Sequence, residues 1–288
     1  MSTHPLELPF KLSTQIQASH AAPHVLLILL NRPEAMNAMS REMEANLTSL
    51  LNWFQENDDY WVAVISGNGK IFCAGADLVD WLKRDYTGFG LQVTNDQEKL
   101  ATMSHGFGSV SRRYHLNKPI IAAVNGGAFG GGTEMILNCD IVIAEEDAKF
   151  AFSEVKHGVI AAAGGIPKLL RTSGHQLAAE MLLLGRNVTA VEARDRFRFV
   201  NEVVPHGKSV ETAIAWAMKI CENSPDAVQA TKHGLMLALL RGGVEEAFTS
   251  HTWSEASKKV WVGENMKEGL RAFFEKRKPA WGNPSTKL

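Results

Sequence analysis

The sequence predicts an α/β fold in its first half, followed by a region made of helices. In the first half, short apolar runs that end at turn residues alternate with helix-like stretches. From about Thr172 onward, helical periodicity dominates. Alternating strands and helices are typical of a parallel sheet, whose sites lie at the strand ends. The 288 residues suit one large domain, or one domain with a smaller appendage.

Four apolar runs predict buried strands: His24–Asn31, Trp61–Gly69, Lys118–Gly127 and Asp140–Asp147. Residues 40–58, between the first two runs, predict a helix that begins after a possible N-cap at Ser40. Its apolar side chains fall at helical spacing and predict the buried face: Met43, Leu47, Leu50, Leu51 and Phe54. The segment Leu78–Asn117 has weak periodicity, and a long irregular segment in a compact domain is often functional.

The second half contains several predicted helices. The stretch "HQLAAEMLLLG" ends at Gly185, and Thr189–Glu192 has the capping-box pattern of a helix start. An amphipathic helix, "SVETAIAWAMKICENSP", stops before Pro225. Three more helical stretches are expected after it, the last being "ENMKEGLRAFFEKRKP".

Composition excludes several classes of function. The net charge is -1, and the longest dense basic run is the short "EKRKP", so nucleic acid is not an expected partner. No run of about 18 apolar residues predicts a membrane span. The three cysteines, Cys73, Cys139 and Cys221, form no CxxC pair and no disulfide framework. They favour a reducing compartment, with the thiols packed as small apolar groups.

The C-terminal tripeptide suggests a location. Thr286-Lys287-Leu288 differs from the peroxisomal address Ser-Lys-Leu by one methyl group. The N-terminus has no apolar signal core. We therefore expect a peroxisomal protein, with a cytoplasmic location as the alternative.

Three consecutive glycines, residues 130–132, follow the third predicted strand and run into an apolar helix-like stretch that contains Glu134. Glycines let backbone N–H groups approach a ligand, and a helix start adds a positive dipole end, so the pattern predicts an anion or oxyanion site. No lysine or GxGxxG pattern marks a phosphate loop, so a carboxylate that moves protons fits better. Spacing alone also allows a plain glycine turn and a solvated glutamate.

Two further features suit the same chemistry. The turn "KIFCAGADL", Lys70–Leu78, follows the second predicted strand and could present another backbone N–H. Glu154 lies in an apolar setting before a Gly/Ala-rich turn. Paired carboxylates in apolar surroundings suit acid and base roles, because burial and mutual repulsion push their pKa values apart.

Six motifs in order now point to one family: "LLNRPEAMNAM", "FCAGADL", "KPIIAAVNGGAFGGGTEM", "CDIVIAEEDAKFAFSEVKHGV", "LLLGRNVTAVEA" and "EGLRAFFEKRKP". With them the chain resembles the crotonase (enoyl-CoA hydratase/isomerase) family over nearly its whole length. The resemblance implies a crotonase-like spiral of ββα units with the acyl-CoA site over residues 1–200, and a C-terminal helical trimerisation region over 201–288. It implies a homotrimer or a dimer of trimers that acts on an acyl-CoA thioester. No cofactor is expected, since coenzyme A is part of the substrate, and no metal.

The resemblance also assigns residue roles. The backbone N–H groups of Ala76 and Gly131 would form an oxyanion hole for the thioester oxygen. Glu134 and Glu154, 20 positions apart, would be the catalytic pair that adds water across the 2,3 double bond. The residues implied in substrate or CoA binding are Arg32, Ala35, Ala74, Asp77, Leu78, Phe273 and Lys276. The last two would reach a neighbouring subunit's CoA, and a solvated basic helix end is the alternative for them.

Other functions stay open at this point. An enoyl-CoA isomerase would shuttle the proton with one carboxylate. A carnitinyl-CoA-type dehydratase would act on a branched or decorated acyl-CoA. A silent crotonase-fold protein would bind an acyl-CoA without catalysis. The presence of both glutamates and both oxyanion positions favours the hydratase.

Two positions depart from the family pattern. Ala162 stands where the turn after the second glutamate often has a glycine, so the water site could differ in shape. Arg198 stands where the helix after Thr189 usually ends in a glycine before a Leu-Val pair. If the backbone there is left-handed, a residue other than glycine costs about 1 kcal/mol of stability.

Overall fold

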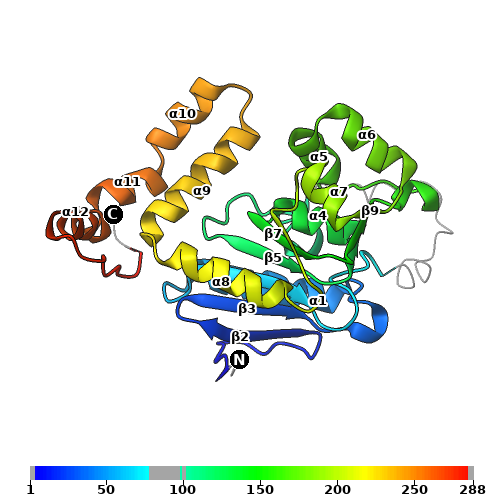
Figure 1. The fold of residues 1–288 in the computed structure, drawn as a ribbon, viewed down its shortest axis with the longest axis horizontal. Helices are drawn as coiled ribbons and strands as arrows, with labels where there is room; N and C mark the ends of the chain where they lie inside the picture. The colour runs from blue at the N-terminus through cyan, green and yellow to red at the C-terminus, as the bar shows by residue number, and fades with distance from the viewer. Residues whose placement is uncertain (1–3, 78–97, 99–101, 285–288) are drawn as a thin grey trace.

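The computed structural model describes residues 4–77, 98 and 102–284. Among them, a seven-stranded sheet has the strand order β1-β2-β3-β4-β5-β7-β10 (Figure 1). Its strands are β1 (His4–Pro5), β2 (Ile16–Ala22), β3 (Val25–Leu30), β4 (Val62–Gly67), β5 (Ile120–Val124), β7 (Ile141–Glu145) and β10 (Glu202–Val204). The four strands predicted from apolar runs are β3, β4, β5 and β7, and all four are confirmed.

The centre of this sheet is parallel, as predicted. Neighbouring strands from β3 to β10 pair in parallel, with Leu27 opposite Val64 and Val64 opposite Ile121. Both faces of these strands are covered, which explains their continuous apolar sequence. The edge differs, because β1 and β2 are antiparallel to their neighbours. The sequence did not reveal β2, whose residues include Gln17, Ser19 and His20 among alanines.

Helix α1 (Arg41–Glu56) follows the predicted pattern. The Ser40 hydroxyl oxygen accepts a 3.1 Å hydrogen bond from the Met43 N–H, which confirms the N-cap. All five apolar residues predicted on its inner face are buried. At its other end, the ammonium of Lys118 donates hydrogen bonds to the carbonyls of Phe54 and Asn57. The helix is therefore tied at its C-terminal end to the segment that leads into β5.

A smaller sheet carries the glycine run. It has the order β6-β8-β9, with strands β6 (Gly127–Phe129), β8 (Lys149–Ala151) and β9 (Val188–Thr189). Helix α4 (Gly131–Asn138) begins two residues after β6, so its first turn lies at the end of this sheet. Gly131, one of the two predicted oxyanion donors, and Glu134 therefore come from a single strand-to-helix junction.

The remaining helices in the described residues are α5 (Gly165–Ser173), α6 (His175–Leu184), α7 (Ala190–Asp195), α8 (Ser209–Cys221), α9 (Pro225–Leu240), α10 (Val244–Thr252), α11 (Glu255–Val262) and α12 (Glu264–Glu275). The part of the chain that the structure describes also has three short 3-10 turns, η1 (Pro33–Ala35), η2 (Phe107–Ser109) and η3 (Glu154–His157). The capping box at Thr189 is present and α6 ends at Gly185, both as predicted, and Gly185 has a left-handed conformation.

The number of C-terminal helices was predicted wrongly. Four helices rather than three follow α8 in the described chain, α9 to α12. The breaks are local: Gly243 and Ser254 have extended backbone before α10 and α11, and the Ser254 hydroxyl caps α11. Helical periodicity alone did not separate these stretches.

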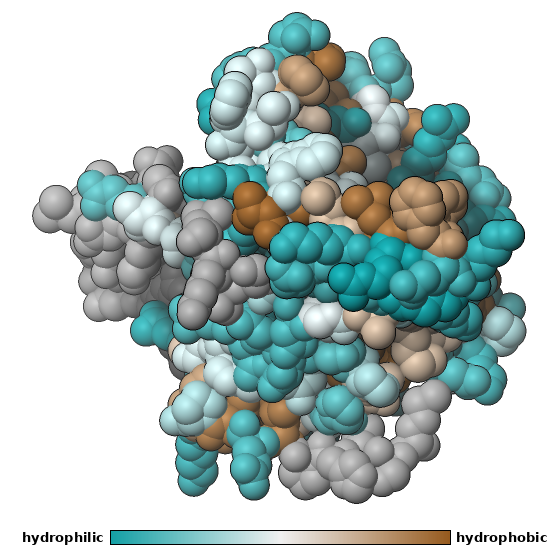
Figure 2. All heavy atoms as spheres, turned by 90° about the vertical axis from the view of Figure 1, so that its left-hand side faces the viewer, coloured by the Kyte–Doolittle hydropathy of each residue, from teal (hydrophilic) through white to brown (hydrophobic). Residues whose placement is uncertain are grey.

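The C-terminal region divides into two parts. Strand β10 pairs with β7, and α8 buries Ala213, Ile214 and Ala217 against the large sheet. Helices α9 to α12 extend away from the sheets on one side (Figure 1). Figure 2 faces this side and shows apolar patches among polar side chains. The exposed large apolar residues of these helices are Leu235, Leu240, Val244, Phe248, Trp261, Val262, Leu270, Phe273 and Phe274.

The backbone at Arg198 is left-handed, with φ 61°. Buried Phe197 and Phe199 flank it and hold the turn against the core. We therefore expect the left-handed backbone at Arg198 to cost about 1 kcal/mol of stability.

The three cysteines carry free thiols, as expected. Burial raises the pKa of Cys73, Cys139 and Cys221 each to about 12. They therefore stay protonated near neutral pH and are poor nucleophiles. None of the helices in the described residues is long and apolar enough to cross a membrane.

Candidate active site

Glu134 lies in the first turn of α4 and is only 4% exposed. Its Oε1 accepts hydrogen bonds from the backbone N–H of Ala163, at 2.9 Å, and of Gly165, at 2.8 Å. A β-carbon placed on Gly165 would lie 2.8 Å from Cγ of Glu134. Glycine at 165 is therefore required for the turn to approach this carboxylate.

The environment of Glu134 raises its pKa to about 7. Burial is the largest cause, and the negative charge of Glu154 adds to it. The hydrogen bonds from Gly165 and Ala163 act in the opposite direction. A carboxyl group with a pKa near neutrality can both take and return a proton under ordinary conditions.

Glu154 is the first residue of η3 and approaches the same glycine run. A β-carbon placed on Gly130 would lie 3.0 Å from Oε1 of Glu154. The other oxygen, Oε2, is buried and accepts no hydrogen bond in the part of the chain that the structure describes. Burial raises the pKa of Glu154 as well. This carboxylate therefore has an unused acceptor beside the start of α4.

The two predicted oxyanion donors lie on adjoining turns. As the first residue of α4, Gly131 has an N–H with no acceptor in its own helix. Gly75, which precedes Ala76, packs against it: a β-carbon on Gly75 would lie 3.4 Å from the Gly131 nitrogen. The Phe129 N–H donates a 2.9 Å hydrogen bond to the Cys73 carbonyl and holds the turns together. The structure thus brings Ala76 and Gly131 into neighbouring positions.

The predicted CoA-binding residues of the first half also come together. Both terminal nitrogens of Arg32 lie 3.2 Å from Oδ2 of Asp77. The N–H of Ala74 donates a 2.9 Å hydrogen bond to the carbonyl of Met36, which directly follows Ala35. These contacts join the loop after β3 to the loop after β4. Leu78 lies outside the described residues.

Asn37 organises this loop pair and was missed. It is buried, with a left-handed backbone, and its Oδ1 accepts a 2.8 Å hydrogen bond from the Arg32 N–H. Its Nδ2 donates to the carbonyls of Asn68 and Ile71, at 2.9 and 2.8 Å. An asparagine before "AM" has no sequence signal of its own, although asparagine tolerates left-handed backbone better than most residues.

Phe273 and Lys276 are not brought to this site. They lie at the end of α12, on the opposite side of the molecule from α4 (Figure 1). The Phe273 side chain is 82% exposed. Within the described part of one chain, the two glutamates and the two turns described above gather around the glycine run.

Two further residues touch the site, and sequence reasoning missed both. The Phe107 ring lies over Gly131, where a β-carbon would be 2.7 Å from the ring atoms. The Ser111 hydroxyl accepts a 2.8 Å hydrogen bond from the Phe107 N–H and donates a 2.7 Å bond to the Ala163 carbonyl. One buried serine therefore connects the residue over the oxyanion position to the turn that holds Glu134.

The family model described as "Enoyl-CoA hydratase/isomerase" matches residues 20–284. Mevalonyl-coenzyme A hydratase sidH of Aspergillus fumigatus is 43% identical over 263 residues, which cover 91% of this chain and 93% of the relative. Mevalonyl-coenzyme A hydratase SIDH of Beauveria bassiana is 41% identical over 268 residues, again 91% and 93%.

Solved structures agree with the sequence comparison. The crystal structure of an enoyl-CoA hydratase from Bacillus anthracis superposes with a TM-score of 0.82 and 33% sequence identity, and the match covers 93% of this chain and 98% of that one. The two sheets and the C-terminal helices are therefore those of a crotonase fold. The chain belongs to the enoyl-CoA hydratase/isomerase family.

Proposed function

We propose that this protein catalyses the reversible addition of water to the 2,3 double bond of an acyl-CoA thioester. The observation that carries the proposal is the pair Glu134 and Glu154 beside the Gly130–Gly132 junction, with the pKa of both carboxyl groups raised. Family members of the hydratase type, at 33% to 43% identity, support the same reaction.

The residues have separate roles in this proposal. The thioester oxygen accepts hydrogen bonds from the N–H groups of Ala76 and Gly131, which stabilise the negative charge of the forming enolate. Glu134 takes a proton from water as the water oxygen bonds to the β-carbon. The π electrons move toward the carbonyl, and Glu154 delivers a proton to the α-carbon. The reverse sequence removes water from a 3-hydroxyacyl thioester.

For the substrate we propose a β-branched thioester of the mevalonyl type. The names of the relatives at 43% and 41% identity support it. A mevalonyl thioester carries a methyl and a hydroxyl group on its β-carbon, so loss of water gives a β-branched 2-enoyl thioester. This substrate falls in the class of branched acyl-CoA that the sequence left open as an alternative.

A substrate panel tests both parts. Dehydration of mevalonyl-CoA and of linear 3-hydroxybutyryl-CoA would be followed by the absorbance of the conjugated thioester. We expect kcat/KM to be at least about tenfold higher for mevalonyl-CoA, since it carries an additional 2-hydroxyethyl group on the β-carbon, and a single fitted methylene is worth about 10–200-fold. A preference for 3-hydroxybutyryl-CoA would refute the proposed mevalonyl-type substrate but not the proposed hydration reaction. Turnover of neither would refute the reaction.

Assembly as a homotrimer or a dimer of trimers is part of the proposal. The exposed apolar side chains on α9 to α12 support it, because a monomer would leave them in water. We propose that the boundary between the spiral core and the C-terminal helical region lies at residue 200. We expect α9 to α12 to mediate the contacts between subunits. Phe273 and Lys276 would then meet the CoA of a neighbouring subunit. Light scattering that shows a stable and active monomer would contradict this.

Peroxisomal import through Thr286-Lys287-Leu288 is a separate proposal, supported by the near match to Ser-Lys-Leu. These residues lie outside the described part of the chain. A fluorescent fusion with a free C-terminus should form puncta that disappear when the tripeptide is deleted. A diffuse signal from the intact fusion would contradict import and favour the cytoplasm.

A further inference from the structure

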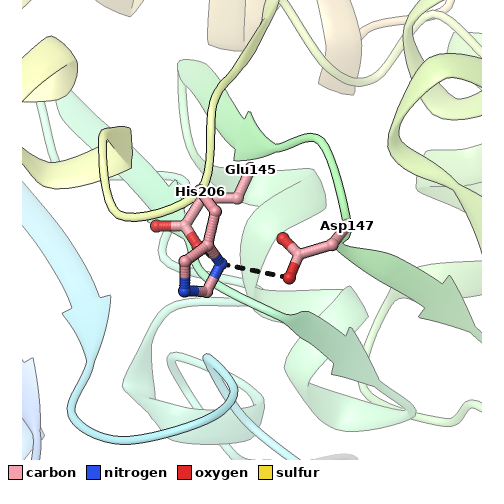
Figure 3. A group of neighbouring side chains, drawn as sticks. All are labelled: Glu145, Asp147 and His206. Carbon is pink, nitrogen blue, oxygen red and sulfur yellow. Dashed lines mark hydrogen bonds and ion pairs between the residues drawn. The ribbon is translucent and has the colours of Figure 1, made fainter.

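Three side chains that the proposed reaction does not use meet at the end of β7 (Figure 3). Glu145 is the last residue of that strand, Asp147 follows two residues later, and His206 lies in the turn between β10 and α8. Nδ1 of His206 is 3.2 Å from Oε2 of Glu145 and 3.1 Å from Oδ2 of Asp147. One potential ligand atom from each residue lies within 4.8 Å of the other two.

Backbone contacts fix this arrangement. Val204 pairs with Glu145 in the parallel ladder between β10 and β7, and the N–H of Glu146 donates a 2.8 Å hydrogen bond to the Val204 carbonyl. The next turn closes with a 3.1 Å bond from the Lys208 N–H to the Pro205 carbonyl. Gly207 within it has φ 76°, a conformation that favours glycine. His206 is therefore held over the end of β7 by the fold itself.

Glu145 is the residue that points to a ligand. It is only 3% exposed, and its Oε1 accepts a 2.8 Å hydrogen bond from the Ser209 hydroxyl. Its Oε2 is buried, faces the His206 ring and accepts no hydrogen bond from any described residue (Figure 3). The one hydrogen bond of His206 Nδ1 in this cluster goes to Asp147. A buried carboxylate oxygen without a donor is costly, so a cation here would stabilise the site.

We propose that Glu145, Asp147 and His206 bind a divalent transition metal ion, with Zn²⁺ as the test ion. Zn²⁺ accepts histidine nitrogen and carboxylate oxygen at about 2.0–2.2 Å, which separates tetrahedral ligands by about 3.3 Å. The separations of 3.1 and 3.2 Å match that geometry. Imidazole nitrogen argues against Mg²⁺ and Ca²⁺, which prefer oxygen. The exposed side of Asp147 and His206 leaves a fourth position to water.

The ion would be structural. It would connect the end of β7 to the turn that leads into α8, and it shares no residue with the pair Glu134 and Glu154. The proposal therefore does not depend on the function proposed above, and binding can be measured without an activity assay.

The test uses untagged, full-length protein freed of metal with a chelator and titrated with ZnCl₂ in a calorimeter. We expect one Zn²⁺ per chain. The exposed ligands give two variants, His206→Ala and Asp147→Asn, and each should weaken binding by at least about tenfold. The matched control is His175→Ala, an exposed histidine at the start of α6, which should bind as the wild type does. Thermal unfolding without metal confirms that each variant folds.

A second readout uses stability. Zn²⁺ should raise the thermal midpoint of the wild type and of His175→Ala, because a ligand that binds only the folded state stabilises it. At the same Zn²⁺ concentration it should raise the midpoint of His206→Ala by less. The proposal is overturned if the wild type binds no Zn²⁺, or if His206→Ala and Asp147→Asn bind it as tightly as the control.

Discussion

The backbone N–H of Ala163 donates a 2.9 Å hydrogen bond to Oε1 of Glu134. It connects the Gly/Ala-rich turn to the carboxylate that we assign as the base. Ala162, the departure from the glycine pattern, is exposed, and the hydrogen bonds from Ala163 and Gly165 are both present beside it. Alanine at position 162 therefore leaves both backbone hydrogen bonds to Glu134 in place.

The rate of hydration should depend on the protonation of Glu134. Its pKa is raised to about 7, and the base must be ionised to accept a proton from water. We therefore expect kcat/KM to fall as the pH drops below about 7. A pH–rate profile checks this, and a rate that stays constant from pH 8 to pH 5 would exclude Glu134 as the base.

The same pKa has a consequence for stability. In the folded protein Glu134 holds its proton up to about pH 7, whereas in the unfolded chain it releases the proton near 4.5. Between these values the folded state binds more protons, so this residue's contribution to stability falls as the pH rises from about 4.5 to 7. Above pH 7 the ionised, buried carboxylate is fully destabilising.

Glu134→Gln should therefore raise the free energy of unfolding at pH 8. The amide oxygen can still accept the hydrogen bonds of Ala163 and Gly165, and the buried charge is removed. The gain should shrink at pH 5, where the wild-type carboxyl is protonated in the fold. Urea unfolding at both pH values measures this, and an equal effect at pH 5 and pH 8 would contradict the raised pKa.

Ser111→Ala should slow the reaction as well as destabilise the protein. The Phe107 N–H and the Ala163 carbonyl each lose a partner, which costs about 1–3 kcal/mol of stability. Because the turn that holds Glu134 shifts, we expect kcat to fall by about tenfold or more with KM little changed. The control is Ser173→Ala, which removes a similar serine bond to the Phe197 carbonyl. An equal loss of kcat in both variants would assign Ser111 a merely structural role.

Arg198→Gly should stabilise the protein by about 1 kcal/mol, because it relieves the left-handed backbone at an exposed position. Arg198→Ala is the matched control, since alanine keeps the β-carbon that causes the strain while removing the charge. Chemical unfolding of the three proteins distinguishes these outcomes. If alanine stabilises as much as glycine, the cause is charge rather than backbone strain.

Periodic features were readable from the sequence. The strand Val25–Leu30 and the helix Arg41–Glu56 carry strong local patterns, and both formed as predicted. Glu134 and Glu154 were predicted as a pair because glycine turns mark their surroundings and because the chain resembles the crotonase family. Strand β2 was missed because its small and polar residues lack the apolar run of a buried strand.

Features that depend on distant pairing could not be read. Phe107 and Ser111 fall in a segment of weak periodicity, and their roles appear only when they touch Gly131 and Ala163. The cluster of Glu145 and His206 depends on the β7–β10 register, which places side chains 61 positions apart in one group. No local sequence pattern predicts that these two side chains lie close together.

The central claim is that Glu134 and Glu154 act together on one water molecule. The direct measurement is hydration by Glu134→Gln, Glu154→Gln and the double variant, with binding of a CoA ester followed in parallel. Each single variant should lower kcat by about 10²–10⁴-fold while CoA-ester binding survives. The double variant should be little worse, because the two carboxylates work as a unit. An isomerase would keep double-bond migration in one single variant. Near-full hydration activity in both single variants would contradict the account.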